Sequence, residues 1–178
     1  MDALARVAVV GTSGSGKSTF ARRLAQIRGT SHIELDALYW GPNWTPAAEP
    51  QFRTAVDVAT SQPCWICDGN YQPVRDLVWG RATAVVWLNY SFSVVFGRAL
   101  RRSIARCIDR QPLFAGNRET FRLSFLSRQS ILIWVLKTYW QRRREFPQLL
   151  SSSELAHLQR IEFATPKLAE AWLRELAS

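Results

Sequence analysis

Cysteine is scarce in this chain, and its three cysteines leave one unpaired in any disulfide scheme. An odd number argues against a disulfide framework. Cys64 and Cys67 do form a C-x-x-C, but Trp65-Ile66 between them and Asp68-Gly69 after them are typical of a strand and its turn. Side chains three apart on a strand point to opposite faces, so the motif predicts neither a redox pair nor a shared zinc site.

Long apolar runs are also missing. The uncharged stretch 83–97 is interrupted by Asn89, Ser91 and Ser93 and is shorter than the roughly 20 apolar residues that a membrane span needs. Arg6 lies inside the first apolar run, so the basic and apolar regions of a signal peptide are not recognisable ahead of it. We therefore expect a soluble, cytoplasmic protein without membrane contact.

Acidic residues are few, at 14 against 23 Lys and Arg, which gives a net charge of +9. The excess is concentrated in residues 98–144, where eleven Arg and one Lys face two acidic residues. Arginine suits bidentate phosphate contacts, although a compositional bias would leave the same pattern. No helix-turn-helix or other named DNA-binding motif is apparent, so nucleic acid is a possible partner but not the favoured one.

Internal repeats and linkers of domain-boundary length are absent as well. With 178 residues and 47% hydrophobic content, the chain is long enough to bury one substantial core. We expect residues 1–178 to form a single α/β domain. The oligomeric state stays open.

The most informative stretch is Gly11-Thr12-Ser13-Gly14-Ser15-Gly16-Lys17-Ser18-Thr19, which contains G-x-x-x-x-G-K-[ST]. It follows a short β-branched run and precedes apolar residues at helical spacing, the context that a phosphate-binding P-loop needs. Its backbone N–H groups and the helix N-terminus would hold the phosphates of ATP. Lys17 would reach the β- and γ-phosphates, and the Ser18 hydroxyl would bind Mg²⁺. A chance Gly/Ser loop would need motif, strand and helix to coincide.

Two carboxylates follow predicted strands. Asp36 ends the short strand predicted at 32–35, and Asp68 follows the strand predicted at 64–67. Both would lie at the carboxyl ends of strands, where open α/β sheets bind ligands. Asp68 would hold Mg²⁺ with Ser18, since Mg²⁺ prefers few carboxylates and several waters. A plain turn at Asp68-Gly69 is the alternative.

Aromatic residues accompany these carboxylates. Tyr39, Trp40 and Trp44 lie in a turn-rich stretch after Asp36, where the indoles either stack on a substrate or roof the core.

The rest of the chain alternates between predicted helices and strands. These are a helix from Pro46 or Pro50 to about 61, a helix 72–79 stopped by Gly80, a strand 84–88, a helix from Ser91 to about 110, a helix 118–145 stopped by Phe146-Pro147, a strand 157–163 and a helix capped by Thr165-Pro166.

These motifs together resemble the adenylate-kinase-like group of small P-loop kinases. Leu35-Asp36-Ala37-Leu38-Tyr39 is similar to the element in which uridine-kinase-type enzymes use the Asp to activate the accepting hydroxyl. Asn70-Tyr71 stands where adenylate kinases carry Phe-Pro-Arg. With Asp-Gly-Asn-Tyr and Gly116-Asn117-Arg118-Glu119, the chain resembles DNA topology modulation or flagellar regulation proteins.

The resemblance implies a P-loop NTPase three-layer sandwich with a five-stranded parallel sheet of order 2-3-1-4-5. It also implies an Arg-rich helical lid within residues 98–145 and an adenine site near Thr165 and Pro166. On the helix from Ser91, a stripe at spacing four contains Arg98, Arg102 and Arg106, and we expect it to close over transferring phosphates.

We therefore expect an ATP- and Mg²⁺-dependent phosphotransferase that acts on a small hydroxyl- or phosphate-bearing, nucleoside- or nucleotide-like substrate. The alternative is a P-loop ATPase or nucleotide-binding regulator that acts on DNA. The expected catalytic residues are Lys17, Asp36, Arg98 and Arg102. The expected substrate-binding residues are Asp36, Tyr39, Trp40, Asp68, Asn70, Tyr71 and Arg118.

Overall fold

A single parallel sheet organises the computed structural model, which describes residues 2–109, 113–117 and 130–178. Its strand order is β2-β3-β1-β4-β5, which confirms the predicted order. The strands are β1 (Arg6–Gly11), β2 (Ser31–Glu34), β3 (Trp65–Asp68), β4 (Ala84–Leu88) and β5 (Gln159–Phe163). All four neighbouring pairs run parallel, so the five carboxyl ends meet at one edge.

Both faces of this sheet are covered, because the inner strands are apolar on each side. Val7 and Val9 of β1 enter one buried cluster, and Ala8 and Val10 enter the other. The same alternation holds along β3 and β4. This is why the inner strands appear in the sequence as continuous apolar runs rather than as alternating ones.

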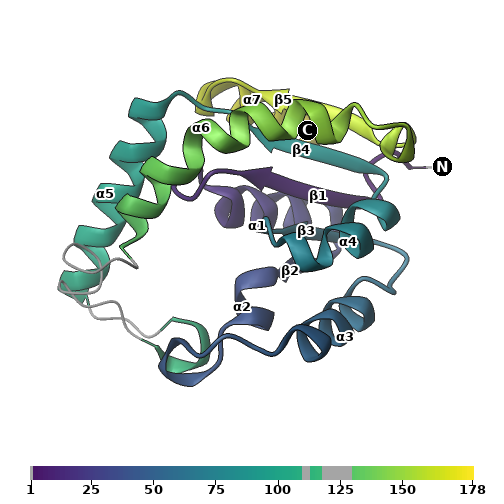
Figure 1. The fold of residues 1–178 in the computed structure, drawn as a ribbon. Coiled ribbons are helices and arrows are strands. Elements are labelled where there is room, and N and C mark those ends of the chain that lie inside the picture. The colour runs from purple at the N-terminus through teal and green to yellow at the C-terminus, as the bar shows by residue number, and fades with distance from the viewer. Residues whose placement is uncertain (1, 110–112, 118–129) are drawn as a thin grey trace.

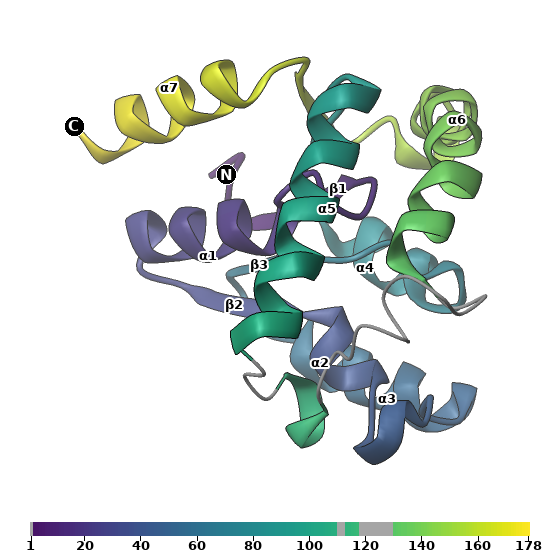
Figure 2. The ribbon, with the colours of Figure 1, turned by 90° about the vertical axis from the view of Figure 1, so that its left-hand side faces the viewer.

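Helices form the outer layers of the sandwich (Figures 1 and 2). The α-helices are α1 (Lys17–Arg28), α2 (Leu35–Tyr39), α3 (Glu49–Ala59), α4 (Arg75–Arg81), α5 (Phe92–Asp109), α6 (Ile131–Leu150) and α7 (Pro166–Ala177). Short 3₁₀ turns are η1 (Pro42–Trp44), η2 (Gln72–Val74), η3 (Phe114–Gly116) and η5 (Ser153–Leu155). Helices α1 and α7 pack on one face, whereas α3 and α4 pack on the other.

Helix α6 takes part in both layers. Val135 and Tyr139 in its first half belong to the cluster of α1 and α7, together with residues of α5. Phe146 and Leu150 in its second half belong to the cluster of α3 and α4. The helix therefore runs along the molecule beside α5 and then over the opposite face (Figures 1 and 2).

Two predicted helix ends are wrong. Gly80 does not stop α4, which continues to Arg81. Pro147 does not end α6, which continues to Leu150 although proline has no N–H for the helical ladder. The buried side chains Phe146 and Leu150 flank Pro147, and their packing outweighs the lost hydrogen bond.

Other boundaries move by a few residues. Helix α3 begins at Glu49 with Pro50 in its first turn, whereas Pro46 pairs with Trp40 in an antiparallel bridge. Helix α6 begins after Ser130, whose hydroxyl accepts a hydrogen bond from Leu132 N–H at 3.3 Å. The predicted helix start at residue 118 lies outside the described residues.

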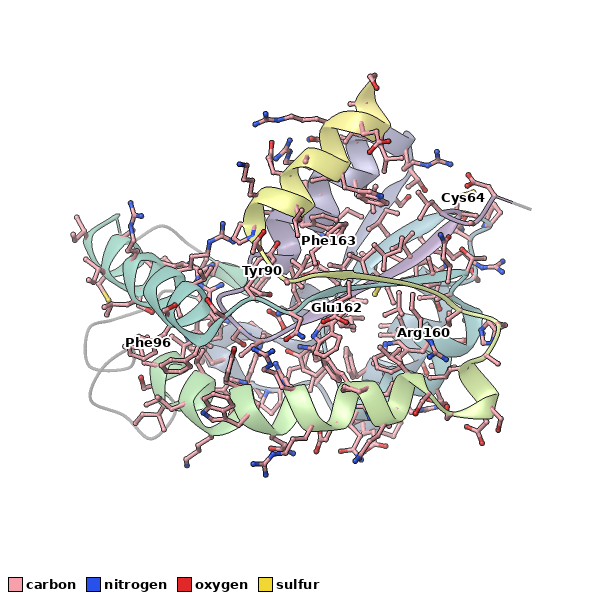
Figure 3. All side chains as sticks on the ribbon, turned by 90° about the horizontal axis from the view of Figure 1, so that it is seen from above. Cys64, Tyr90, Phe96, Arg160, Glu162 and Phe163 are labelled. Carbon is pink, nitrogen blue, oxygen red and sulfur yellow. The ribbon has the colours of Figure 1, made fainter. Side chains whose placement is uncertain are left out.

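The cysteines lie apart from the sheet edge that holds the P-loop. Cys64 is exposed just before β3, at the opposite end of the molecule from Phe96 of α5 (Figure 3). Cys67 is buried inside β3, where desolvation raises the pKa of its thiol. Both are free, as the sequence predicted. No helix in the described part of the chain is long and apolar enough to cross a membrane.

Candidate active site

Three loops meet at the carboxyl edge of the sheet. In the register of the strands, Val9 lies beside Asp68, and Glu34 lies beside Asp68 on its other side. The loop after β1 therefore faces the ends of β2 and β3. Because parallel strands end at one edge, the predicted phosphate loop and both predicted carboxylates come together there.

The loop after β1 has the backbone of a phosphate cradle. Gly14 has φ +90°, and a Cβ there would lie 2.6 Å from Val95 O of α5, so only glycine allows this close approach. Gly16 takes the N-cap position of α1 in the left-handed region, and no side chain caps the helix. Asn70 fastens the loop, since its Nδ2 donates to Gly11 O at 2.5 Å.

Lys17 points back into this loop. Its Nζ donates to Thr12 O at 3.4 Å. Burial, followed by the charge of nearby Arg142, lowers the pKa of the ammonium group to about 8, while Asp68 and Asp36 act in the opposite direction. A buried cation that donates to one carbonyl oxygen among the described residues favours an anion in the loop.

The hydroxyl of Ser15 supports the same conclusion. Ser15 is 1% exposed, and its Oγ has no hydrogen-bond partner among the described residues. Thr12 is buried beside it and accepts the Ser15 N–H at 3.0 Å. Ser13 is partly buried and Thr19 is exposed at the loop's outer side. An orphaned buried donor, a buried ammonium group and an uncapped helix N-terminus fit the phosphates of a nucleotide.

Ser18 and Asp68 form the predicted metal-binding pair. The Ser18 hydroxyl donates to Asp68 Oδ2 at 2.7 Å, and His32 Nε2 lies 2.7 Å from the other oxygen, Oδ1. Asp68 is 3% exposed, so these contacts fix its orientation. Glu34 also lies close: burial and the charge of Asp68 raise the pKa of its carboxyl, and Ser18 lowers it by a hydrogen bond.

This donor set fits Mg²⁺ better than a metal with many protein ligands. Among the described residues, no group of three or more His, Cys, Asp or Glu is arranged to hold a metal ion. Mg²⁺ keeps several waters and takes one or two carboxylates together with phosphate oxygens. The Ser18 hydroxyl at the start of α1 and the Asp68 carboxylate at the end of β3 are ligands of this kind, and Mg²⁺ binding by them stays a prediction.

Asp36 stands opposite the P-loop, in the first turn of α2 rather than at the end of its strand. The Tyr71 hydroxyl donates to Asp36 Oδ1 at 2.6 Å. Burial, followed by the charge of Asp36, raises the pKa of the Tyr71 phenol, so the phenol keeps its proton and remains a donor. Among the described residues nothing donates a hydrogen bond to the second oxygen of Asp36, which leaves it available to a ligand.

Aromatic rings line the side of Asp36 away from the P-loop. The Tyr39 ring packs against Tyr71 at 4.5 Å and against Phe52 at 5.1 Å between centroids. Trp40 meets Tyr39 edge-on at 4.9 Å and Trp44 at 5.7 Å. The two indoles are partly buried, so they pack on one another and still present surface. Their stacking on a substrate stays a prediction.

Two of the predicted arginines reach the P-loop from α5. Arg98 Nη1 donates to Ser15 O at 3.1 Å, and its guanidinium lies over the Tyr90 ring, 5.5 Å from the centroid. The charge of Arg102 lowers the pKa of Lys17, which places it beside the same loop. Arg118 lies outside the described residues.

A further arginine comes from α6. Arg142 Nη1 donates to Gly11 O at 3.5 Å, and burial lowers the pKa of its guanidinium. The charge of Arg75 lowers this pKa further, whereas Asp36 and Tyr71 raise it. Arg142 therefore stands between the P-loop and the Asp36–Tyr71 pair, although the sequence alone did not show where the arginines at the end of α6 point.

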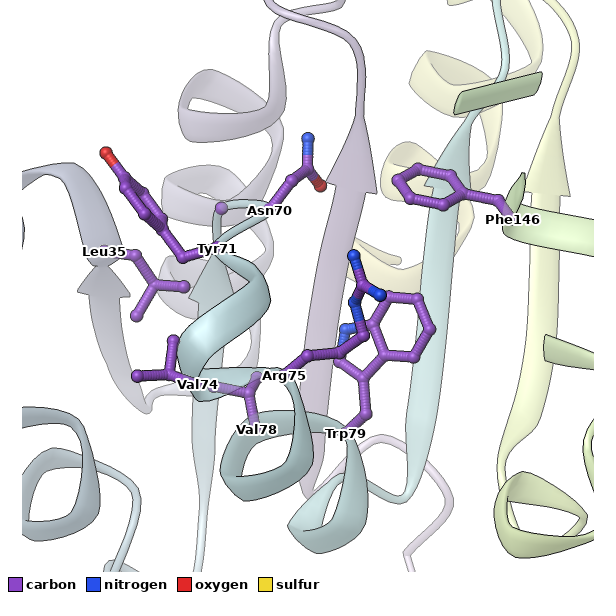
Figure 4. Close-up of a pocket in the computed structure, with 9 residues that line it drawn as sticks. Leu35, Asn70, Tyr71, Val74, Arg75, Val78, Trp79 and Phe146 are labelled. Atoms are coloured by element: carbon purple, nitrogen blue, oxygen red, sulfur yellow. The ribbon is translucent and has the colours of Figure 1, made fainter. Parts of the chain in front are cut away.

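A small hollow adjoins the Asp36–Tyr71 pair. It is lined by Leu35, Asn70 and Tyr71 on one side and by Arg75, Trp79 and Phe146 on the other (Figure 4). The guanidinium of Arg75 lies over the Trp79 ring, 5.3 Å from the centroid. The hollow thus combines apolar walls with one cation.

Thr165 and Pro166 open α7 directly after β5, at the same edge of the sheet. Thr165 is the N-cap, and its Oγ1 accepts the Leu168 N–H at 3.3 Å. This confirms the predicted cap. The expected adenine contact at these two residues stays a prediction.

Sequence reasoning missed several members of the site. His32 and Glu34 lie on β2 and contact Asp68 or Ser18, and an alternation of polar residues in that short strand was the available signal. The hydrogen bond between Tyr71 and Asp36 joins the start of η2 to the first turn of α2. No local pattern reveals such a pairing.

Comparisons with known proteins support the fold. Neither protein-family models nor curated proteins give a match. A gluconokinase from Sinorhizobium meliloti 1021 has a similar structure, with a TM-score of 0.52 and 22% identity over 98% of this chain and 94% of that chain. A shikimate kinase from Bacteroides thetaiotaomicron gives 0.56 and 13%, over 96% and 95%. The chain thus has the fold of small P-loop kinases, and these matches do not bear on the DNA topology modulation proteins.

Proposed function

We propose that this protein is an ATP- and Mg²⁺-dependent phosphotransferase whose acceptor is a small hydroxyl compound. The observation that carries the proposal is the convergence of Lys17 and Asp36, from the first turns of α1 and α2, onto one place. Phosphoryl transfer depends mainly on positioning and on charge stabilisation. The site provides a phosphate cradle, a candidate metal pair, a carboxylate and several cations within reach of one another.

The P-loop would hold the nucleotide. Backbone N–H groups of Gly11–Thr19 and the N-terminus of α1 would bind the phosphates, while Ser18 and Asp68 would hold Mg²⁺. Thr165 and Pro166 would lie beside the adenine. Bound Mg²⁺ and ATP would supply the phosphoryl group and neutralise part of its charge.

Asp36 would orient the acceptor hydroxyl and take its proton. The Tyr71 phenol holds one carboxylate oxygen, so the other can accept a hydrogen bond from the acceptor. Lys17, Arg102 and Arg142 surround the position between Asp36 and the P-loop. Fixed cations there would stabilise the charge that develops on the transferring group. Residues 98–145 would form the Arg-rich lid.

The cations near Asp36 favour an acceptor that carries an anionic group. Arg75 lines the hollow beside Tyr71, and Arg142 faces the same pair. Arginine binds carboxylates and phosphates through paired N–H donors. A hydroxy acid or a nucleotide-like phosphate ester would satisfy both the cations and Asp36. The two similar structures are named a gluconokinase and a shikimate kinase.

The deciding experiment measures ADP formation with a panel of hydroxy acids, nucleosides, nucleotides and neutral alcohols. The Lys17→Ala variant serves as the blank, and calorimetric binding of Mg·ATP is measured in parallel. We expect Mg²⁺-dependent ATP binding, with turnover dependent on an anionic acceptor. Absence of Mg·ATP binding, or equal turnover in the Lys17→Ala variant, would end the proposal.

Arg102→Ala tests the arginines of α5, with exposed Arg101→Ala on the same helix as its control. We expect the Arg102 variant to lose about 10²-fold or more in kcat/KM, as other losses of a phosphate-directed cation do. The Arg101 variant should keep its turnover. Equal rates in both variants would remove Arg102 from the catalytic set.

A second candidate function, a nucleotide-dependent regulator that binds nucleic acid, draws on the outer face of α6. Trp134 and Trp140 are 50% and 59% exposed there, and Lys137 and Arg144 are exposed with them. Aromatic rings and cations together can bind single strands by stacking and charge. Salt-dependent binding of single-stranded nucleic acid that persists in the Lys17→Ala variant would favour this candidate.

A further inference from the structure

The loop that carries the two indoles of the acceptor side is a tight hairpin. Trp40 and Pro46 form an antiparallel bridge, and Gly41 N–H donates to Thr45 O at 2.8 Å. At its tip, Asn43 and Trp44 both have positive φ, at 57° and 56°. A tryptophan in this region is strained and persists only where surrounding contacts hold it.

Asn117 supplies such contacts from a segment more than seventy residues away in sequence. Its Oδ1 accepts the Trp44 N–H at 3.0 Å, and its Nδ2 donates to Gly41 O at 2.8 Å. The side chain therefore clasps both ends of the hairpin tip. Asn117 is 6% exposed, which shields the two bonds from water.

The segment around Asn117 is itself folded to present this side chain. Leu113 N–H donates to Asn117 O at 2.6 Å, and Asn117 N–H donates to Phe114 O at 3.1 Å. The turn includes η3, with Ala115 at φ 52°. Asn117 belongs to the Gly116-Asn117-Arg118-Glu119 motif, for which the phosphate and metal sites gave no role.

The clasp connects to the candidate catalytic carboxylate through packed rings. Trp40 meets Tyr39 at 4.9 Å, and Tyr39 packs on Tyr71 at 4.5 Å between centroids. Tyr71 in turn donates to Asp36. A shift of the hairpin would therefore move the aromatic wall beside Asp36, whereas the P-loop is held separately by Arg98 and by its close approach to α5.

We propose that Asn117 is a positioning residue for acceptor binding: it holds the Trp40–Pro46 hairpin, and with it the aromatic wall of the acceptor site, in place. The role in acceptor binding rests on the proposed function, whereas the two hydrogen bonds of Asn117 to the hairpin do not depend on it. Residues 113–117, which lie between α5 and α6, would thereby set acceptor affinity through one amide side chain. Asn117 touches neither nucleotide nor acceptor in this role.

The test separates the clasp from the catalytic proposal by using a spectroscopic signal. The protein has eight tryptophans, and 5-fluorotryptophan labelling gives each a ¹⁹F resonance that substitution of single tryptophans assigns. In Asn117→Ala we expect the Trp40 and Trp44 resonances to shift or broaden, while those of buried Trp65 and Trp79 stay unchanged. Unmoved Trp40 and Trp44 resonances would overturn the proposal, whether or not the protein is a kinase.

Kinetics then test the acceptor side. Asn117→Ala should raise the acceptor KM about tenfold, the scale of one or two lost hydrogen bonds, with the KM for ATP unchanged. Asn117→Asp keeps an oxygen for the Trp44 N–H but sets a second, charged oxygen against Gly41 O in place of the donor, so its acceptor KM should rise at least as much as in Asn117→Ala. Equal increases in both KM values would show a merely structural role and overturn the proposal.

Thr54→Ala is the matched control, because Thr54 Oγ1 also bonds a backbone carbonyl, Pro50 O at 2.9 Å, on the neighbouring helix α3. It should move neither the Trp44 resonance nor the acceptor KM. If wild type itself transfers phosphate to no acceptor, the proposed function fails and the ¹⁹F spectra alone decide the clasp. If turnover is present and the resonances stay fixed in Asn117→Ala, the proposed function stands and the clasp fails.

Discussion

Replacing Lys17 by methionine should stabilise the protein in the absence of nucleotide and abolish ATP binding. Burial is the main cause that lowers the pKa of Lys17 from 10.5 to about 8. This difference corresponds to about 3 kcal/mol by which the folded state disfavours the charged ammonium group at neutral pH. Methionine has a similar length and no charge, so Lys17→Met should unfold about 3 kcal/mol less readily at pH 7. For a chain of this size that is roughly 6–12 °C in unfolding temperature.

The pH dependence of this difference identifies its cause. Below pH 8 Lys17 is protonated in both the folded and unfolded states, so the wild type bears the full penalty. Between pH 8 and 10.5 the unfolded state binds more protons, and the stability contributed by Lys17 rises with pH. The advantage of the variant should therefore shrink to nearly zero by pH 10.5.

Urea unfolding of both proteins at pH 7 and 10, with calorimetric ATP binding, measures these effects. Lys167→Met on the exposed side of α7 is the control and should change neither quantity. A Lys17→Met protein that is less stable than wild type at pH 7 would refute the reasoning. So would a stability difference that stays constant with pH.

Three further predictions test the site by substitution. Asp36→Asn should lower kcat with little change in ATP affinity, whereas Asp68→Asn should shift the Mg²⁺ titration; one common effect on that titration would contradict separate roles. Arg142→Ala should lower kcat/KM about 10²-fold or more, and exposed Arg144→Ala should not; steady-state rates that fall equally in both would argue against a specific cation. Gly14→Ala should lower the unfolding temperature and ATP affinity together, because its Cβ would meet a carbonyl of α5 at 2.6 Å.

The local parts of the site were predictable from the sequence. The P-loop needs a glycine where α5 approaches and a lysine and serine at fixed spacing, and all of these are adjacent in sequence. Asp68 follows a strand whose continuous apolar character is set by burial on both faces. Parallel pairing then places the strand ends at one edge, so the meeting of Lys17 and Asp68 follows from sheet geometry.

The long-range parts were not predictable in the same way. Arg142 reaches Gly11 from α6, and the helical pattern around it does not say against which neighbour that helix packs. The rule for proline also predicted that the helix would end at Pro147, and helix packing overruled it. The contact of Asn117 with the hairpin joins segments whose register depends on the whole fold, and no spacing in the sequence encodes it. Such contacts require the three-dimensional structure.

Helix α6 contributes side chains to both buried clusters, and this limits how parts of the protein can unfold locally. Its first half completes the buried cluster under α1 and α7, and its second half completes the one under α3 and α4. Detaching the helix would therefore expose both clusters at once, so neither face can open alone by releasing it. In amide hydrogen exchange, β1, β4 and the middle of α6 should exchange with one common opening free energy, equal to that of global unfolding. The nucleotide side and the acceptor side would then share a single cooperative unit, and tightening either one would protect the other.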